Sequence, residues 1–162
     1  MEYQHITHPF DPIYDCNSRI LILGSLPSVK SRENAFYYGH PQNRFWKLLA
    51  ALCNAPIPES IDDKICLLQS SRIALWDVIQ SCDIRGSSDS SIKKVVPTDL
   101  RIILDHAKIQ KIYANGKTAA ALYQKYQMPL TGLKIIPLPS TSPANAMWTM
   151  ERLCEAWKII LE

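Results

Sequence analysis

Short apolar runs alternate along this chain with segments of helical periodicity, and this alternation limits the folds that it can adopt. Four runs are expected to be strands: residues 19–24, 72–79, 111–114 and 133–139. Runs of this length, apolar almost throughout, are typical of strands buried on both faces. Since helices are expected between them, the pattern predicts an α/β fold in which helices cover both faces of a mostly parallel sheet.

Five segments are expected to be helical. Their apolar residues recur at helical spacing or follow sequences that commonly begin a helix. They are residues 45–52, 60–69, 99–107, 115–126 and 146–162. The polar stretch 80–96, rich in serine and charge, is expected to be a long loop.

Composition narrows the class of protein. With 162 residues and 47% hydrophobic residues, a single domain over residues 1–162 is expected. No apolar run is long enough to cross a membrane, and the first residues do not resemble a signal peptide. The five cysteines lack a C-x-x-C pair, which argues against a disulfide framework or a metal centre and suits the cytoplasm. A net charge of +3 permits a nucleic-acid partner without requiring one.

Three loops should leave the carboxyl ends of the parallel strands, where such sheets bind their ligands: residues 24–43, 80–91 and 139–145. They are rich in neutral amides, hydroxyls, prolines and tyrosines, and His40 is their only histidine. No Ser–His–Asp set and no pair of carboxylates can be assembled from them. Neutral groups of this kind hold phosphates and read base edges, and tyrosines stack on bases. The loops therefore favour a site for a flipped nucleotide.

Each loop also has a purely structural interpretation, which the sequence leaves open. "GSLPS" (24–28) is compatible with a tight strand exit, and "STSPAN" (140–145) with the cap of the last helix. Pro41 could stand at the first position of a helix, with Asn43 satisfying its free backbone amides. Ser60 with Asp63 resembles a capping box, and Thr98 could cap the helix that follows it.

Several of these segments resemble the uracil-DNA glycosylase superfamily. "YGHPQNRFW" (38–46) is similar to the "HPxNRFW" element of the mismatch-specific enzymes, and "NGKTA" (115–119) resembles their strand-to-helix turn. The combination of "GSLPS", "YYGHPQNRFW" (37–46), "LWDVI" (75–79) and "LPSTSPAN" (138–145) looks most like the hypoxanthine-DNA glycosylase branch. The resemblance implies a three-layer α/β/α sandwich with a central four-stranded parallel sheet. It also implies metal-free and cofactor-free cleavage of damaged double- or single-stranded DNA that leaves an abasic site.

One position departs from these relatives. Where they carry an asparagine or an acidic residue in the first loop, this chain has Leu26, which cannot hydrogen-bond. The hypoxanthine branch is thought to use an asparagine in the "HPQNRFW" element, so Asn43 is the expected catalytic residue. Its carbonyl oxygen could orient a water toward the anomeric carbon.

The resemblance assigns the other site residues as well. Tyr38 is expected to stack on the flipped base, with Tyr37 as the alternative. The base should be held by Gly24, Ser25, Leu26, Pro27, Tyr38, Trp76 and Asp77. The DNA should be contacted by His40, Ser140, Thr141, Ser142, Pro143, Ala144 and Asn145.

Hypoxanthine is the expected substrate, with uracil or xanthine possible, and a monomer is the expected state. Two other interpretations stay open. One is a uracil- or mismatch-specific glycosylase, and the other is a non-catalytic module of the same fold that binds DNA or nucleotides.

Overall fold

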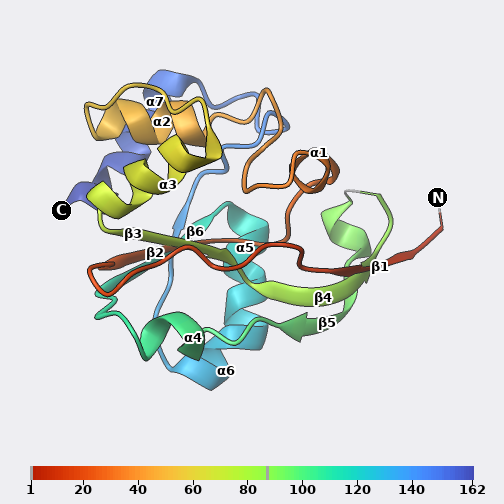
Figure 1. The fold of residues 1–162 in the computed structure, drawn as a ribbon. Coiled ribbons are helices and arrows are strands. Elements are labelled where there is room, and N and C mark those ends of the chain that lie inside the picture. Colours follow the sequence, from red (N-terminus) through yellow and green to blue (C-terminus); the bar gives the residue numbers. More distant parts are fainter. Residues whose placement is uncertain (1, 87) are drawn as a thin grey trace.

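A parallel sheet of four strands lies at the centre of the computed structural model, which describes residues 2–86 and 88–162 (Figure 1). Its strands are β2 (Ile20–Gly24), β3 (Ile73–Asp77), β6 (Lys111–Asn115) and β7 (Ile136–Leu138). They stand in the order β3-β2-β6-β7, and every pairing is parallel. The central sheet predicted from the four apolar runs is thereby confirmed.

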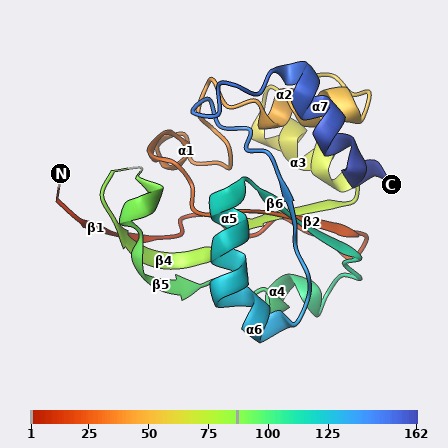
Figure 2. The same ribbon diagram turned by 180° about the vertical axis from the view of Figure 1, so that it is seen from behind.

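Helices cover both faces of this sheet, as Figures 1 and 2 show. One layer holds α2 (Phe45–Leu52), α3 (Ile61–Ser70) and α7 (Met150–Trp157), the last extended by a 3₁₀ turn, Lys158–Leu161. The other holds α4 (Arg101–Leu104), α5 (Lys117–Leu122) and α6 (Met128–Thr131). This is the predicted three-layer α/β/α arrangement. A short helix, α1 (Val29–Glu33), lies in the first loop.

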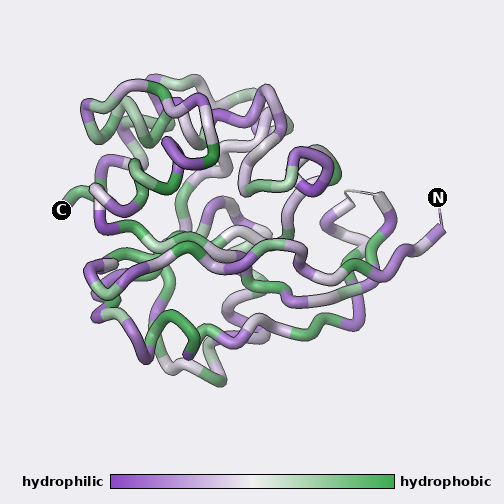
Figure 3. The backbone as a smooth tube through the Cα atoms, viewed as in Figure 1, coloured by the Kyte–Doolittle hydropathy of each residue, from purple (hydrophilic) through white to green (hydrophobic). Residues whose placement is uncertain are grey.

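The core lies between the sheet and its helical layers. Leu21, Ile22 and Leu23 of β2 are completely buried, as expected for a strand covered on both faces. From α2, Phe45 and Leu48 pack onto the same core. Figure 3 shows the apolar segments that run through the central strands.

A second, antiparallel sheet corrects the prediction of a loop over residues 80–96. Strands β1 (Gln4–Thr7), β4 (Ile79–Ile84) and β5 (Lys93–Pro97) pair in the order β1-β4-β5. A 3₁₀ turn, Asp89–Ser91, lies between β4 and β5, and residue 87 is outside the described residues. These strands are half exposed, so polar residues occupy many of their positions and the sequence resembles a loop.

The predicted helix starts are partly confirmed. Ser60 caps α3 by accepting the N–H of Asp63 at 3.0 Å. Pro41, in contrast, precedes α2 by four positions. Thr98 does not cap α4, because its buried hydroxyl donates to the carbonyl oxygen of Asp77 at 2.7 Å. The last helix is capped by Thr149 and not by the "STSPAN" segment.

A π-helical turn, Tyr123–Gln127, joins α5 to α6. The extra residue in such a turn changes which side chains face inward, and such turns are frequent near functional sites. Here the buried Gln127 side chain donates from Nε2 to the carbonyl oxygens of Thr98 at 2.9 Å and Val78 at 3.1 Å. The Gln127 side chain thus holds the backbone at Val78, directly after β3. Among the described residues, no helix is both long and apolar enough to cross a membrane.

Candidate active site

A cleft of about 850 Å³ opens at the carboxyl ends of the parallel strands. Its walls come from the residues that follow β2, β6 and β7, and from Tyr38 and Asn43 of the first loop. This is where ligands bind in open α/β sheets. The topology therefore brings together segments that are more than 100 residues apart in the sequence.

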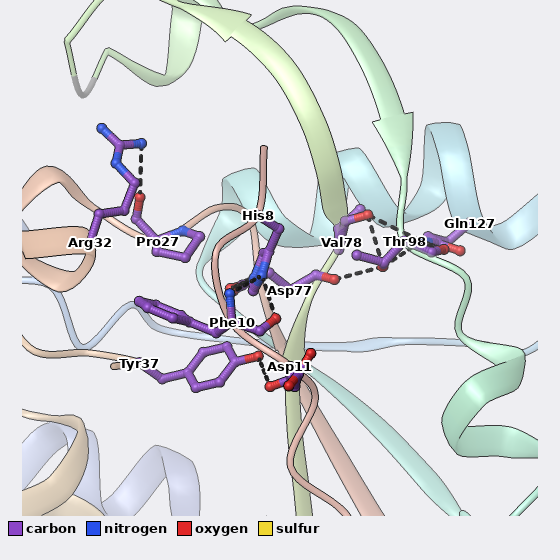
Figure 4. A network of polar contacts seen from close by, with 10 residues as sticks. All are labelled: His8, Phe10, Asp11, Pro27, Arg32, Tyr37, Asp77, Val78, Thr98 and Gln127. Carbon is purple, nitrogen blue, oxygen red and sulfur yellow. Dashed lines mark hydrogen bonds and ion pairs between the residues drawn. The ribbon is translucent and has the colours of Figure 1, made fainter. Parts of the chain in front are cut away.

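The floor of the cleft is built around the carboxylate of Asp77, at the end of β3. Its Oδ2 lies 2.7 Å from Nε2 of His8, whose side chain is completely buried (Figure 4). A Cβ atom on Gly24 would lie only 2.4 Å from Asp77 Oδ1. Glycine is therefore required at this position so that the carboxylate can lie against the end of β2.

Tyr38 stands beside this floor. Its backbone has a positive φ of 52°, a conformation that costs a non-glycine residue on the order of 1–3 kcal/mol. Its ring packs on Phe45, with ring centroids 4.2 Å apart. The Tyr38 hydroxyl is buried without a hydrogen-bond partner among the described residues. Burial, reinforced by the charge of Asp77, raises the pKa of Tyr38 above its ordinary value, so the hydroxyl keeps its proton.

Tyr37 has a different environment. It is 2% exposed, its hydroxyl donates to the carbonyl oxygen of Asp11 at 2.7 Å, and its ring contacts Phe10. Burial and the nearby Asp77 raise the pKa of Tyr37 as well. Tyr37 also lines the cleft, but its ring and hydroxyl are engaged in the core.

Asn43 is held by a chain of side-chain contacts across the cleft. Its Oδ1 accepts the backbone N–H of Phe45 at 3.0 Å and the hydroxyl of Thr141 at 2.8 Å. The Thr141 oxygen in turn accepts from Nδ2 of Asn115 at 3.0 Å. Since the Phe45 amide can only donate, the Asn43 side chain must turn its oxygen toward α2. The Nδ2 group of Asn43 makes no hydrogen bond in the described part of the chain.

Arg44 fixes the loop on the opposite wall. Its guanidinium donates to the carbonyl oxygens of Ser142 at 2.9 Å and Asn145 at 3.0 Å, and it also contacts those of Thr141 and Trp148. Its backbone N–H donates to Thr141 as well, at 3.1 Å. One side chain therefore sets the course of residues 141–148.

The comparisons with known proteins agree with this geometry. Residues 12–161 match the family model described as the uracil DNA glycosylase superfamily. The chain belongs to this superfamily.

Two similar sequences in this superfamily carry the name hypoxanthine DNA glycosylase. The protein from Methanosarcina acetivorans is 33% identical over 159 residues, which cover 96% of this chain and 98% of the relative. The protein from Methanosarcina barkeri is 36% identical over 110 residues, which cover 67% and 70%. The solution NMR structure of a candidate uracil DNA glycosylase from M. acetivorans has a TM-score of 0.82. It is 31% identical and covers 98% of both chains. The superfamily expected from the sequence is thereby confirmed.

Most of the predicted site residues line the cleft of this glycosylase fold. The lining includes Asn43 and six of the residues expected to hold the base: Gly24, Ser25, Leu26, Pro27, Tyr38 and Asp77. It also includes five of the residues expected to contact DNA: Ser140, Thr141, Ser142, Ala144 and Asn145. Lining the cleft does not establish their roles, which stay predictions.

Trp76 is the clearest exception. It lines a separate cavity of about 390 Å³ together with His8 and Phe10, and its buried Nε1 has no partner among the described residues. Successive side chains of a strand point to opposite faces, and here Asp77 lines the cleft whereas Trp76 does not. His40 and Pro143 also lie outside the cleft lining, and His40 Nδ1 accepts the backbone N–H of Gln42.

Sequence reasoning missed three residues of the site: His8, Arg44 and Asn115. Asn115 ends β6 at the same edge as Gly24 and Asp77, a position that the sequence could have indicated. Arg44 lies inside the "HPQNRFW" element, but nothing in the sequence indicates its distant partners, and no local pattern marks His8. Within residues 2–86 and 88–162, no three histidine, cysteine, aspartate or glutamate side chains are grouped so that they could hold a metal ion.

Proposed function

We propose that this protein is a monomeric, cytoplasmic DNA glycosylase that flips a deaminated base out of DNA and hydrolyses its N-glycosidic bond, leaving an abasic site. Hypoxanthine is the preferred base, and no metal or cofactor takes part. The observation that carries the proposal is a cleft in which Asp77 is the single buried carboxylate of the described lining, beside neutral hydroxyl and amide groups and the cations Arg32 and Lys117, in a chain similar along 96% of its length to a hypoxanthine DNA glycosylase.

The reaction follows from the groups that line the cleft. Breaking the glycosidic bond leaves positive charge on the sugar and negative charge on the departing base, so fixed dipoles at these places lower the barrier. A water then bonds to the anomeric carbon, and the proton that it loses neutralises the base anion. Asn43 Oδ1 already accepts two hydrogen bonds. The amide therefore acts through Nδ2, which donates to the departing base. DNA phosphates stabilise the sugar cation, so no carboxylate is needed in the position that Leu26 occupies.

Base selection depends on the floor of the cleft. Hypoxanthine presents an acceptor at O6 and a donor at N1–H. Backbone amides of the 24–27 turn meet O6, and the Asp77 carboxylate accepts the N1 proton. Adenine presents a donor at C6 and an acceptor at N1, so both contacts fail. Each buried polar group left unpaired costs about 1–3 kcal/mol, which is enough to exclude adenine.

The serine hydroxyls of the 140–145 segment hold the flanking phosphates. Ser140 Oγ accepts the backbone N–H of Ser142 at 3.1 Å, and Ser142 Oγ accepts that of Ala144 at 3.2 Å. Because each oxygen is fixed by an N–H group, its own proton is available for a phosphate oxygen.

Matched duplexes that carry one lesion each, opposite the same base, test this function. Under single-turnover conditions with alkaline cleavage of abasic sites, we expect hypoxanthine to be released faster than uracil, since the small Ser25 and apolar Leu26 leave room for a purine. A uracil rate that equals or exceeds the hypoxanthine rate would favour a uracil-specific enzyme. Specific binding without release of any base would identify a non-catalytic module.

The aromatic contact with the flipped base is tested at Tyr38. Tyr38→Leu should weaken the productive complex with lesion duplex by about 1–3 kcal/mol, the usual contribution of one stacked base. Tyr38→Phe keeps the ring and removes only the unpartnered hydroxyl, so it should bind within a few-fold of the unmodified protein. Equal losses in the two variants, measured by fluorescence anisotropy, would show that the hydroxyl and not the ring makes the contact.

A further inference from the structure

His8 lies before residue 12, where the family-model match begins, yet its side chain contacts the Asp77 carboxylate in the floor of the cleft. It follows β1 directly, and its side chain is 0% exposed. Nε2 lies 2.7 Å from Asp77 Oδ2, 69 positions along the chain. On the other side of the ring, Nδ1 lies 2.9 Å from the carbonyl oxygen of Phe10 and 3.2 Å from its backbone nitrogen. Figure 4 shows His8 between Phe10 and Asp77.

The short Nε2–Oδ2 contact fixes where the proton of this pair can be. If Nδ1 accepts the Phe10 N–H, the imidazole is neutral and carries its proton on Nε2. If Nδ1 donates to the Phe10 oxygen, the proton between Nε2 and Oδ2 belongs either to an imidazolium or to the carboxyl group. In each case it lies between Nε2 and Oδ2. With that proton held at Oδ2, Oδ1 of the ionised carboxylate is free to act as an acceptor.

Oδ1 is also the oxygen that a ligand can use. It makes no hydrogen bond to any residue that the structure describes, and Asp77 is part of the cleft lining. The missing side chain of Gly24 leaves room for it. The backbone after Asp77 is held as well, since Thr98 donates to the Asp77 carbonyl oxygen at 2.7 Å. The carboxylate thus has one oxygen fixed by His8 and one oxygen facing the cleft.

We propose that His8 is a positioning residue that determines base specificity: it keeps Asp77 Oδ1 as an obligatory acceptor, so the cleft takes only bases that carry a ring N–H at that edge. This inference rests on the proposed function and extends it. Deamination of adenine converts the N1 acceptor into N1–H, and deamination of cytosine does the same at N3. The His8–Asp77 pair therefore distinguishes hypoxanthine from adenine and uracil from cytosine, while guanine and thymine, which carry the same ring N–H, are rejected by other contacts.

Without His8, Asp77 would be a buried carboxyl group with no partner on Oδ2. Such a group favours its protonated form, because an isolated charge is costly in a buried site. A protonated Asp77 can donate, and it would then meet the ring acceptor of adenine or cytosine. Loss of His8 should therefore lower the release of deaminated bases and weaken discrimination against normal ones.

His8→Gln and His8→Asn form a matched pair that tests the roles of the two ring nitrogens separately. A glutamine amide reaches the place of Nε2 and can donate to Asp77, whereas an asparagine amide reaches the place of Nδ1 and serves only Phe10. The measurement is single-turnover release of hypoxanthine, uracil and adenine from matched duplexes, with thermal melting as the control for folding. For His8→Gln we expect discrimination between hypoxanthine and adenine within about 3-fold of the unmodified protein. For His8→Asn we expect hypoxanthine release to fall about 10- to 100-fold and discrimination to fall with it.

Asp77→Asn supplies a second measurement that does not depend on the folding of His8→Asn. Asparagine can turn its amide nitrogen toward the cleft, so we expect discrimination between hypoxanthine and adenine to fall. In that background, His8→Gln should leave the base ratios unchanged, because the carboxylate through which His8 acts is absent. Two results would overturn the proposal: unchanged base ratios in a folded His8→Asn variant, or a His8→Gln variant that loses discrimination as His8→Asn does. If the unmodified protein releases no base at all, the proposed function itself fails, and this result is distinguishable from either.

Discussion

Replacing Asn43 by alanine is expected to reduce single-turnover base release about 10²–10³-fold, the usual effect of removing one preorganised donor. Binding of lesion duplex should stay within a few-fold, because Tyr38 and the 140–145 segment remain. Base release slows because the substitution removes Nδ2, which faces the cleft and makes no hydrogen bond to the described residues. Quenched-flow cleavage with matched binding curves measures both quantities.

Asn43→Asp is the matched control for this result. The carboxylate can still accept from the Phe45 amide and the Thr141 hydroxyl, so it keeps the helix contact and removes only the donor. We expect this variant to be as slow as Asn43→Ala while melting near the temperature of the unmodified protein. Near-normal or faster release by Asn43→Asp would mean that the side chain orients water through its oxygen. Near-normal release by both variants would leave Asn43 only a helix cap.

Arg44→Met should have the second large effect, on both stability and activity. Methionine has a similar length but donates no hydrogen bond, so the carbonyl oxygens of Thr141, Ser142, Asn145 and Trp148 lose a charged partner. We expect the free energy of unfolding to fall by about 2–4 kcal/mol. Base release should fall as well, because the 141–148 segment forms one wall of the cleft. Urea unfolding and single-turnover cleavage measure these changes.

Arg152→Met is the control for Arg44→Met, because Arg152 also contacts the 141–148 segment. The Arg152 side chain is exposed, donates to the carbonyl oxygen of Met147 at 3.1 Å, and lies over the Trp148 ring. Exposed substitutions of this kind usually change stability by less than about 0.5 kcal/mol. If both variants lose the same stability, the effect of Arg44 does not come from its carbonyl contacts.

Buried and local features were predictable from the sequence. The four apolar runs indicated the central sheet, because strands covered on both faces must be apolar almost throughout. Asn43, Tyr38 and Ser140 were assigned to one site, since parallel strands deliver their loops to the same edge. Strands β4 and β5 were missed because they are half exposed and their polar residues resemble a loop.

The remaining site contacts could not be predicted because they join distant segments. The bond between His8 and Asp77 spans 69 positions, and those from Arg44 to the 141–148 carbonyl oxygens span about 100. No periodicity or capping rule applies at such separations. The position of Trp76 outside the cleft lining could have been anticipated, because the side chains of consecutive strand residues point to opposite faces.

The N-terminal segment has a practical consequence for shortening the protein. The superfamily match begins at residue 12, so a truncation designed on that boundary would keep every recognisable motif. It would also remove β1 and the imidazole of His8, leaving the edge of β4 unpaired and open to association with other chains. Such a fragment would still be assigned to the superfamily by its sequence, but it would lack the partner of the carboxylate to which we assign base selection.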